Sequence, residues 1–289
     1  MTTFKRVALI GKYKSLEIAE PLLKLAQFLV RRGVDVVIDP LTAANIGDNG
    51  HEVASLEQIG SSAELAIVIG GDGTMLNIAR TFAPYDVALV GVNQGRLGFL
   101  TDLSMETMYE SIGSILDGDF VTESRMLLEA EVLSGERPAM RVLAFNDISV
   151  NKGAEGSLIE IEVRIDGQFV YNLRSDGLIV ASPTGSTAYA LSSGGPILHP
   201  SLDCIALVPV SPHTLSNRPI VLGRDAVIDI IILKGADARA HFDSHSHYEL
   251  QERDRVVVRR APRPIRLLHP HGYNYFHMLR EKLHWSETL

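Results

Sequence analysis

The sequence predicts an α/β domain with a Rossmann-like parallel sheet, followed by an all-β domain. In the first third of the chain, short apolar runs alternate with stretches of helical spacing, whereas beyond about residue 120 strand signals dominate. With 289 residues and 46% hydrophobic content, the chain can bury two cores. We therefore expect an α/β domain over residues 1–120, a β-rich domain over 121–270, and a helix in 271–289 that packs back on the first domain.

The first domain contains four short apolar runs, which predict strands of a parallel sheet whose two faces are both covered. Helical spacing over residues 16–32 predicts one helix, and a second is expected to begin near Thr74. Turn-forming residues between Asn45 and Gly50 predict a mobile loop. The four predicted strands are Arg6–Ile10, Val34–Ile38, Leu65–Ile69 and Val87–Val92.

The second domain carries clear strand patterns. Residues 158–163 alternate between apolar and charged side chains, and Asp166-Gly167 then predicts a hairpin turn into a strand over 168–173. Further strands are expected over 227–233 and 255–259. Helical spacing returns between Tyr273 and Trp285, which is the basis for the expected C-terminal helix.

Composition narrows the classes of partner. The net charge of −8 argues against nucleic acid or an anionic membrane as the main partner. Apolar runs of the 18 residues that a spanning helix needs do not occur. The one cysteine, Cys204, allows neither an intramolecular disulfide nor a multi-cysteine metal site. Because the first ten residues also lack the pattern of a signal peptide, we expect a cytoplasmic protein.

The motif Gly70-Gly71-Asp72-Gly73-Thr74 lies between a predicted strand and a predicted helix. Open α/β sheets bind ligands at this edge, glycines allow close approach of backbone N–H groups to phosphate, and the helix N-terminus adds partial positive charge. A carboxylate is a poor phosphate ligand, so Asp72 suits a general base acting on a hydroxyl group. The five residues equally allow a tight turn in which Asp72 is the N-cap of the helix.

Two further polar segments follow. The first is Asn146-Asp147, which comes after the apolar run 142–145 and could bind a ribose diol, although such a dipeptide is more often a turn. The second runs from Arg174 through Ser182-Pro183-Thr184-Gly185-Ser186-Thr187-Ala188-Tyr189, where small hydroxyl residues would suit close approach of a polar ligand. A Ser/Thr turn that caps a short helix is the alternative for this segment.

Taken together and in this order, these segments and Gly95–Leu100 resemble the NAD kinase family. The resemblance implies transfer of the terminal phosphoryl group of ATP, or of polyphosphate, to the 2′-hydroxyl of the adenosine ribose of NAD, which gives NADP, with Asp72 as general base. It also implies a divalent cation, usually Mg²⁺, that accompanies ATP, no tightly bound prosthetic group and no metal site of the protein itself, and a homodimer or homotetramer. The phosphate donor would be bound by Gly70, Gly71, Gly73 and Thr74, and NAD by Asp72, Gly73, Phe99, Asn146, Asp147, Arg174, Asp176, Thr184, Thr187, Ala188, Tyr189 and Ser192.

The chain departs from the family pattern at three places. Asp147 stands where many members have Glu, so the reach of the carboxylate is one carbon shorter. Ser182 stands where Thr is common, and Asp243-Ser244-His245 replaces Asp-Gly-Gln. The last departure puts a ligand role for His245 in doubt, and none of the three affects Asp72.

Alternatives remain at this stage. On a strand, His241, Asp243, His245 and His247 would share one face and could hold a metal, although a solvated or subunit-facing strand is the plainer interpretation. A lipid kinase could share the glycine–Asp turn, and a non-catalytic sensor could bind the same dinucleotide. The sequence does not distinguish ATP from polyphosphate as donor, or NAD from NADH as acceptor.

Overall fold

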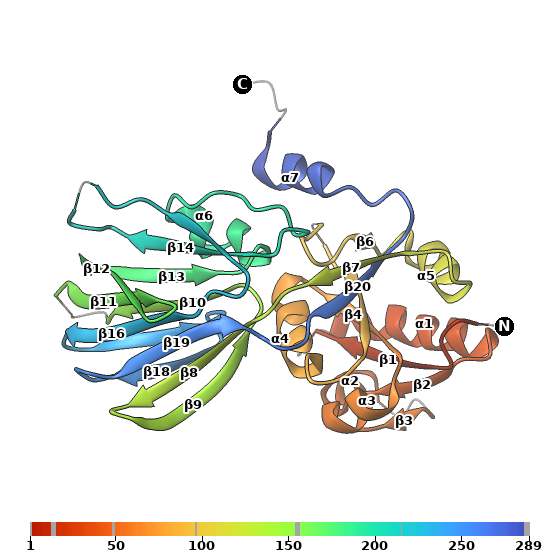
Figure 1. Cartoon of the computed structure of the whole chain (residues 1–289). Helices are drawn as coiled ribbons and strands as arrows, with labels where there is room; N and C mark the ends of the chain where they lie inside the picture. The colour runs from red at the N-terminus through yellow and green to blue at the C-terminus, as the bar shows by residue number, and fades with distance from the viewer. Residues whose placement is uncertain are drawn as a thin grey trace. The chain divides into compact units, whose positions relative to one another are not determined.

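The computed structural model describes residues 2–12, 16–47, 50–95, 97–153, 157–214 and 216–285. The chain forms two compact units. Unit 1 contains Met1–Ser124 together with Ile265–Leu289, and unit 2 contains Arg125–Pro264. In Figure 1 the C-terminal segment of unit 1 is blue and its N-terminal elements run from red to yellow. Of the loop predicted over 45–50, residues 48 and 49 lie outside the described residues, as do Arg96 and the last four residues of the predicted C-terminal helix region.

Unit 1 is built on an eight-stranded sheet with the order β3-β2-β1-β4-β5-β20-β7, in which β6 also pairs with β5. The pairs β1–β2, β1–β4, β4–β5 and β5–β20 are all parallel. The strands are β1 (Arg6–Gly11), β2 (Asp35–Ile38), β3 (Glu52–Val53), β4 (Leu65–Gly70), β5 (Ala88–Asn93), β6 (Leu103–Ser104), β7 (Val121–Arg125) and β20 (Ile265–His269).

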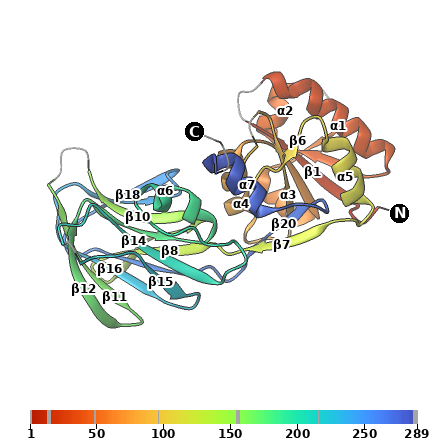
Figure 2. The same cartoon turned by 90° about the horizontal axis from the view of Figure 1, so that it is seen from above.

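Helices cover both faces of this sheet, which explains why β4 and β5 are buried along their whole length. Leu22 and Leu25 of α1 and Ile112 of α5 share one core cluster with the strands, whereas α3 and α4 pack against each other. Figure 2 shows α1 and α5 on one side of the strands of unit 1 and α3 and α4 on the other. The helices are η1 (Leu16–Ile18), α1 (Ala19–Arg31), α2 (Pro40–Ile46), α3 (Leu56–Ser62), α4 (Asp72–Phe82), α5 (Met108–Leu116) and α7 (Tyr275–Leu283).

Unit 2 consists of two six-stranded antiparallel sheets, seen in Figure 1. Their orders are β15-β14-β13-β10-β17-β18 and β12-β11-β16-β19-β8-β9. Alternate residues of both sheets, such as Val150, Ile161 and Val256, form one hydrophobic core. The strands are β8 (Leu128–Ser134), β9 (Arg137–Ala144), β10 (Asp147–Lys152), β11 (Ile159–Ile165), β12 (Gln168–Ser175), β13 (Gly177–Ala181), β14 (Cys204–Val210), β15 (Ile220–Gly223), β16 (Ile228–Lys234), β17 (Ala238–Phe242), β18 (Ser246–Leu250) and β19 (Arg255–Arg260).

The other side of β13 is covered by the segment that follows it, which contains η2 (Thr184–Thr187) and α6 (Tyr189–Ser192). Ala190 and Leu198 of this segment pack on Ile179, Ala181 and their neighbours on β14. All five residues of β13 are therefore buried, although β13 belongs to an antiparallel sheet. The hydroxyl-rich segment is thus held against the sheet by apolar contacts.

The predicted architecture, a parallel α/β domain and a β-rich domain, is confirmed. The structure divides the chain differently from the expected ranges 1–120, 121–270 and 271–289, because β7 and β20 both join the sheet of unit 1. Parallel pairing of Arg266 and Leu267 with β5 places residues 265–269 in that sheet and buries Leu267 and Leu268. The dominance of strand signals beyond residue 120 placed this segment in the β-rich domain, but strand signals do not specify which sheet a strand joins.

The interpretation of residues 241–247 as a single strand was wrong. Asp243 and Ser244 both have left-handed backbone conformations, with φ of 50° and 54°, and form the turn of the β17–β18 hairpin. The four polar residues therefore do not share one strand face. His241 and His247 instead lie opposite each other on the two strands of the hairpin.

Candidate active site

Asp72 lies where the buried strand β4 passes into α4. Gly71 is the N-cap residue and provides no side-chain cap, and α4 begins at Asp72, two residues before the predicted start at Thr74. The interpretation of Asp72 as N-cap is therefore wrong. The half-buried carboxylate is available for contacts beyond its own helix.

The Asp72 carboxylate is fixed by the loop that follows β5. Its Oδ2 accepts a hydrogen bond from Phe99 N at 2.9 Å, and its Oδ1 accepts one from Leu100 N at 3.0 Å and one from Thr101 Oγ1 at 3.3 Å. A Cβ atom at Gly98 would lie 2.1 Å from Asp72 Oδ1, so only glycine fits there. The hydrogen bonds and the close approach of Gly98 thus fix the loop 98–101 and the Asp72 carboxylate relative to each other.

Thr101 is itself held from behind. Its Oγ1 accepts a hydrogen bond from Asn93 Nδ2 at 3.1 Å, and its carbonyl oxygen accepts one from Gly98 N at 3.0 Å. Asn93, at the end of β5, also accepts a hydrogen bond from Gly95 N at 2.6 Å through its Oδ1. These buried contacts restrict the loop, and hence the orientation of the Asp72 carboxylate.

The three glycines around Asp72 differ in what surrounds them. A Cβ atom at Gly70 would lie 2.7 Å from Thr74 Oγ1, so the packing of Thr74 requires a glycine there. At Gly71 and Gly73, a Cβ atom would have no neighbour within 4 Å. Packing within the protein therefore does not require a glycine at these two positions, and the backbone beside Asp72 is left uncovered by a side chain there.

In unit 2, Asp243 organises the segment that contains Asn146 and Asp147. Its carboxylate accepts hydrogen bonds from the backbone N–H groups of Phe145, Asn146 and Asp147 at 2.8, 2.7 and 3.1 Å. The sequence indicated Asp243 as part of a possible metal cluster and of a departure from the family pattern, but it did not predict this role. Because the partners are more than ninety residues apart, local pattern offers no direct signal for it.

Asp147 is only 5% exposed. Burial, together with the nearby negative charge of Asp243, raises the pKa of Asp147 to about 7. Near neutral pH, a substantial fraction of this carboxyl group is therefore protonated and can donate a hydrogen bond as well as accept one. Such a group suits a sugar hydroxyl, which also both donates and accepts.

Two hydroxyls of the segment after β13 serve the protein itself. Ser182 Oγ donates to Phe145 O at 2.5 Å and accepts from Gly185 N at 3.2 Å. Ser186 Oγ donates to Pro183 O at 2.6 Å and accepts from Leu198 N at 2.9 Å. Both hydroxyls are therefore used in turns within the protein, as the alternative interpretation expected, but neither of them caps η2 or α6.

The segment after β13 also packs closely against the backbone of Asn146. Ser182 N donates to Asn146 O at 2.9 Å, and a Cβ atom at Gly185 would lie 2.1 Å from that oxygen. Thr184 accepts a hydrogen bond from the buried Arg125 at 3.1 Å. Tyr189 follows η2 and is 38% exposed. Its pKa is raised by partial burial and by the charges of Asp147 and Asp176, which places its ring near both carboxyl groups.

The remaining predicted residues are distributed around this cluster. Thr187 donates to Thr184 O at 3.2 Å, Ala188 links η2 to α6, and Ser192 ends α6. Asp176 pairs with Lys152 at 2.7 Å, an ion pair that the sequence analysis did not identify. Arg174 is exposed on β12, 3.8 Å from Glu160. Unit 2 therefore gathers Asn146, Asp147, Thr184 and Tyr189 in one place, and unit 1 gathers Gly70–Thr74 with Phe99.

The histidines of the β17–β18 hairpin do not form the metal cluster considered above. The rings of His241 and His247 are 5.8 Å apart between centroids, and burial, His247 and Arg239 all lower the pKa of His241. Within the part of the chain that the structure describes, His, Cys, Asp and Glu do not form any group of three or more that could hold a metal ion.

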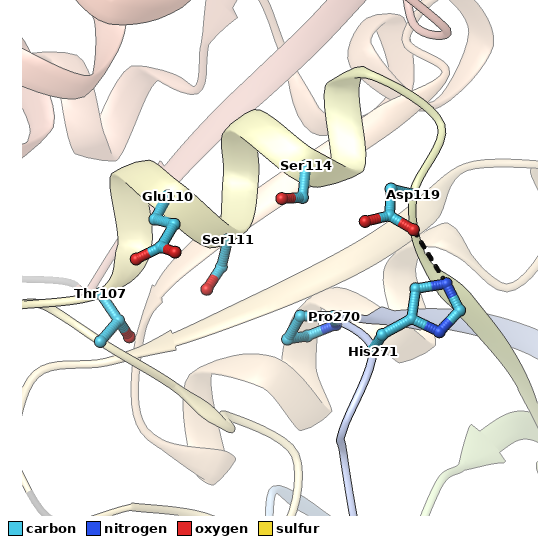
Figure 3. Close-up of a pocket in the computed structure, with 7 residues that line it drawn as sticks. All are labelled: Thr107, Glu110, Ser111, Ser114, Asp119, Pro270 and His271. Atoms are coloured by element: carbon cyan, nitrogen blue, oxygen red, sulfur yellow. Dashed lines mark ion pairs between the residues drawn. The ribbon is translucent and has the colours of Figure 1, made fainter.

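Two open grooves of unit 1 are lined by residues outside the Gly70–Thr74 turn. Figure 3 shows the larger, of about 370 Å³, in which Glu110 and Ser111 of α5 face Pro270 and His271, and His271 pairs with Asp119 at 3.0 Å. A second groove of about 300 Å³ is bordered by Leu97, Asp102 and the start of the C-terminal segment. Neither contains a predicted site residue, so the Asp72 turn is the stronger candidate on chemical grounds.

The helices described here include none long and apolar enough to cross a membrane.

The fold, together with the Asp72 carboxylate held beside Gly71 and Gly73, is that of a two-domain phosphotransferase with an α/β domain and a β-rich domain. Residues 7–120 match the model of the ATP-NAD kinase N-terminal domain, and residues 145–269 match that of the ATP-NAD kinase C-terminal domain. The chain belongs to the NAD kinase family. This confirms the family that the sequence motifs indicated.

Individual relatives agree over the full length. The chain is 59% identical to the NAD kinase of Nitrosospira multiformis, over 99% of this chain and 97% of that protein, and 58% identical to that of Nitrosomonas eutropha, over 100% and 97%. The structure of yeast NADH kinase complexed with NADH has a TM-score of 0.91 at 23% identity and covers 99% of this chain and 89% of that one. An Archaeoglobus fulgidus NAD kinase in complex with ATP gives a TM-score of 0.73 at 24% identity, over 96% and 98%. The two solved structures establish the shared fold.

Proposed function

We propose that this enzyme transfers the terminal phosphoryl group of ATP to the 2′-hydroxyl of the adenosine ribose of NAD, giving NADP, with Asp72 as general base. One observation carries the role of Asp72: its carboxylate is held by Phe99 N and Leu100 N at the end of β4, next to the open positions of Gly71 and Gly73. The names of the relatives supply the substrate class.

The hydrogen bonds of Asp72 fit a base that receives one proton. An ionised carboxylate has about four acceptor positions. Among the described residues, two donors occupy Oδ1 and one occupies Oδ2, so a second position on Oδ2 is available for a substrate hydroxyl. As the ribose oxygen attacks the terminal phosphorus atom, its proton passes to Oδ2, and the bond from phosphorus to the bridging oxygen of ADP breaks.

NAD binding is assigned to the residues inferred from the family. In unit 2, the partly protonated Asp147 and the Asn146 amide would hydrogen-bond to ribose hydroxyls, and Tyr189 offers an exposed aromatic ring for a base. The full set comprises Asp72, Gly73, Phe99, Asn146, Asp147, Arg174, Asp176, Thr184, Thr187, Ala188, Tyr189 and Ser192. The assignment is weakest for Arg174, because this exposed side chain faces Glu160.

The donor phosphates are assigned to Gly70, Gly71, Gly73 and Thr74. The open space at Gly71 and Gly73 fits a phosphate chain approaching the N-terminus of α4. ATP is the proposed donor, and polyphosphate would offer the same phosphate chemistry. A divalent cation, Mg²⁺ in this proposal, would enter on the donor's own oxygens and neutralise their charge.

We further propose that the enzyme is a cytoplasmic homodimer or homotetramer. The outermost strands of unit 2, β9, β12, β15 and β18, each leave one edge without a strand partner in the described sheets, which supports self-association. The single cysteine is compatible with a reducing compartment. Sedimentation of the purified enzyme tests the assembly directly, and a monomer at micromolar concentration would contradict it.

A coupled assay of NADP formation from NAD and ATP tests the function. We expect Asp72→Asn to lower kcat by roughly 10²- to 10⁴-fold, because proton transfer by a positioned base contributes about this much. Asp86→Asn, an exposed aspartate of the same unit, is the matched control and should retain wild-type activity. If the wild-type enzyme forms no NADP, the proposed function is refuted. If Asp72→Asn retains full activity, the proposed role of Asp72 as general base is refuted. A non-catalytic sensor would bind NAD in both forms without transfer.

A further inference from the structure

His269, the last residue of β20, lies between two carboxylates in the interior of unit 1. Only 1% of the residue is exposed. Its Nδ1 is 2.9 Å from Asp102 Oδ2, and its Nε2 is 3.2 Å from Glu123 Oε2. The ring of Tyr273 stacks on the imidazole at 3.8 Å with an interplanar angle of 9°. The cluster thus joins the loop before β6, strand β7 and the segment after β20.

This geometry favours the charged imidazolium. A neutral imidazole donates from one nitrogen only, so it could satisfy one of the two carboxylates and would present a lone pair to the other. Burial opposes the charge, but the hydrogen bonds and negative charges of Asp102 and Glu123 outweigh it and raise the pKa of His269. The nearby His271 has a different partner, since its ring pairs with Asp119 at 3.0 Å (Figure 3).

The cluster is connected to Asp72 through a very short stretch of chain. Asp102 directly follows Thr101, whose hydroxyl contacts the Asp72 carboxylate. Phe99 and Leu100, whose N–H groups hold that carboxylate, come just before. The loop is therefore fixed by Asp72 within residues 99–101 and by His269 at Asp102, immediately before β6 begins at Leu103.

We propose that His269 is a positioning residue for the catalytic carboxylate, and that its protonated ring, by holding Asp102, keeps the loop 98–102 in the arrangement that orients Asp72. This inference rests on the proposed role of Asp72 as general base. It adds a residue that contacts neither substrate nor the reacting atoms and that acts entirely through the loop.

The consequence of losing the proton follows from the charges. Without the imidazolium, the two partly buried carboxylates of Asp102 and Glu123 flank a ring that carries no charge and donates from one nitrogen only, an arrangement that is unfavourable away from bulk water. Asp102 borders the groove of about 300 Å³, so it has solvent-accessible space into which it can turn. The loop then shifts, the N–H groups of Phe99 and Leu100 lose their alignment, and the Asp72 carboxylate is no longer held toward the substrate.

The pH dependence of kcat gives the sharpest test. As pH rises through the raised pKa of His269, the proton is lost and kcat should fall while KM for NAD changes little. Asp102→Asn retains an oxygen acceptor for Nδ1 but removes one negative charge. It should move this alkaline midpoint down by about one pH unit, because a neighbouring opposite charge supports a pKa by roughly 1 to 3 units. Glu123→Gln should act in the same direction.

His271→Gln is the matched control. This exposed histidine also pairs with a carboxylate, but that partner is Asp119 and not a residue of the loop 98–102, so the midpoint should stay at its wild-type position. His269→Gln should remove the alkaline transition and lower kcat about tenfold or more. If that variant fails to fold, the two carboxylate variants still decide the question, since a merely structural role for the cluster would not shift a midpoint.

A second measurement does not depend on activity. In an NMR titration of the wild-type protein, the backbone amide signals of Phe99 and Leu100 should shift with the same midpoint as the ring of His269. Absence of NADP formation by the wild type would refute the proposed function while leaving this coupling measurable. The inference would be overturned if these amide signals did not change as His269 titrates, or if the alkaline midpoint of kcat were the same in Asp102→Asn as in the wild type. Either result would count even if the enzyme makes NADP.

Discussion

Asp243 and Asp147 are joined by two hydrogen bonds: Asp243 N donates to the backbone carbonyl oxygen of Asp147 at 3.0 Å, and Asp147 N donates to the Asp243 carboxylate at 3.1 Å. This reciprocal pair attaches the turn of the β17–β18 hairpin to the start of β10. It also brings the two carboxyl groups close enough for the charge of Asp243 to affect Asp147.

Replacing Asp243 by Asn tests the attachment. Asn presents only one oxygen, so at least one of the three backbone N–H donors loses its partner, and the amide NH₂ group faces other donors. We expect the free energy of unfolding to fall by about 1–3 kcal/mol in urea denaturation. Asp225→Asn, an exposed aspartate of the same unit, should change it by less than about 0.5 kcal/mol. Equal effects of the two substitutions would show that the attachment contributes nothing.

Asp147 should make stability depend on pH. Its pKa is about 7 in the folded protein and about 4 in an unfolded chain, so the folded state holds the proton more tightly. The associated stability is fully present below pH 4 and is lost as pH rises toward 7 and above, by up to about 4 kcal/mol. Asp147→Asn removes this dependence. Comparing unfolding of both proteins from pH 4 to 8 checks the prediction, and parallel curves would contradict it.

Two glycine substitutions distinguish the proposed binding of the donor phosphates by Gly73 from the positioning of the Asp72 carboxylate by the loop that contains Gly98. Gly73→Ala has open space around the new methyl group, so the fold should be unaffected while KM for ATP rises several-fold. Gly98→Ala places a Cβ atom 2.1 Å from Asp72 Oδ1 and should lower kcat by tenfold or more. Steady-state kinetics with ATP and NAD varied separately distinguishes the two. A loss of kcat in Gly73→Ala with unchanged KM would argue against a phosphate cradle.

Ser244 should be replaceable by glycine with a gain in stability. Its φ of 54° costs a non-glycine residue about 1–2 kcal/mol, part of which glycine's greater freedom in the unfolded chain offsets. We expect Ser244→Gly to raise the free energy of unfolding by roughly 0.5–1 kcal/mol. Ser246→Gly, two residues later in β18, is the matched control and should lower stability by a similar amount. A gain at both positions would mean that the backbone conformation is not responsible.

Features encoded over a few neighbouring residues were predictable from the sequence. The passage from β4 through the glycines to α4, the Asp166-Gly167 hairpin and the change from α/β to β-rich structure all follow from local periodicity and turn chemistry. The predicted start of α4 near Thr74 differs by two residues from the observed start at Asp72.

Contacts between distant parts of the chain could not be obtained in this way. Asp243 reaches Phe145, and His269 reaches Asp102 and Glu123, across separations of about 100 residues or more. A single sequence contains no periodicity that links such positions. For the same reason the hydroxyls of Ser182 and Ser186 looked available for a ligand, whereas the folded protein uses them internally.

The place of β20 between β5 and β7 has a consequence for biosynthesis. Ribosomes release the chain from its amino end, so an interior strand of the first sheet emerges only after every residue up to Pro264 has been made. Until then, the start of β5 around Ala88 and Leu89, where β20 will pair, remains an open parallel edge. Translation stopped anywhere before Ile265 therefore yields a protein with an incomplete first sheet, however well the β sandwich has formed.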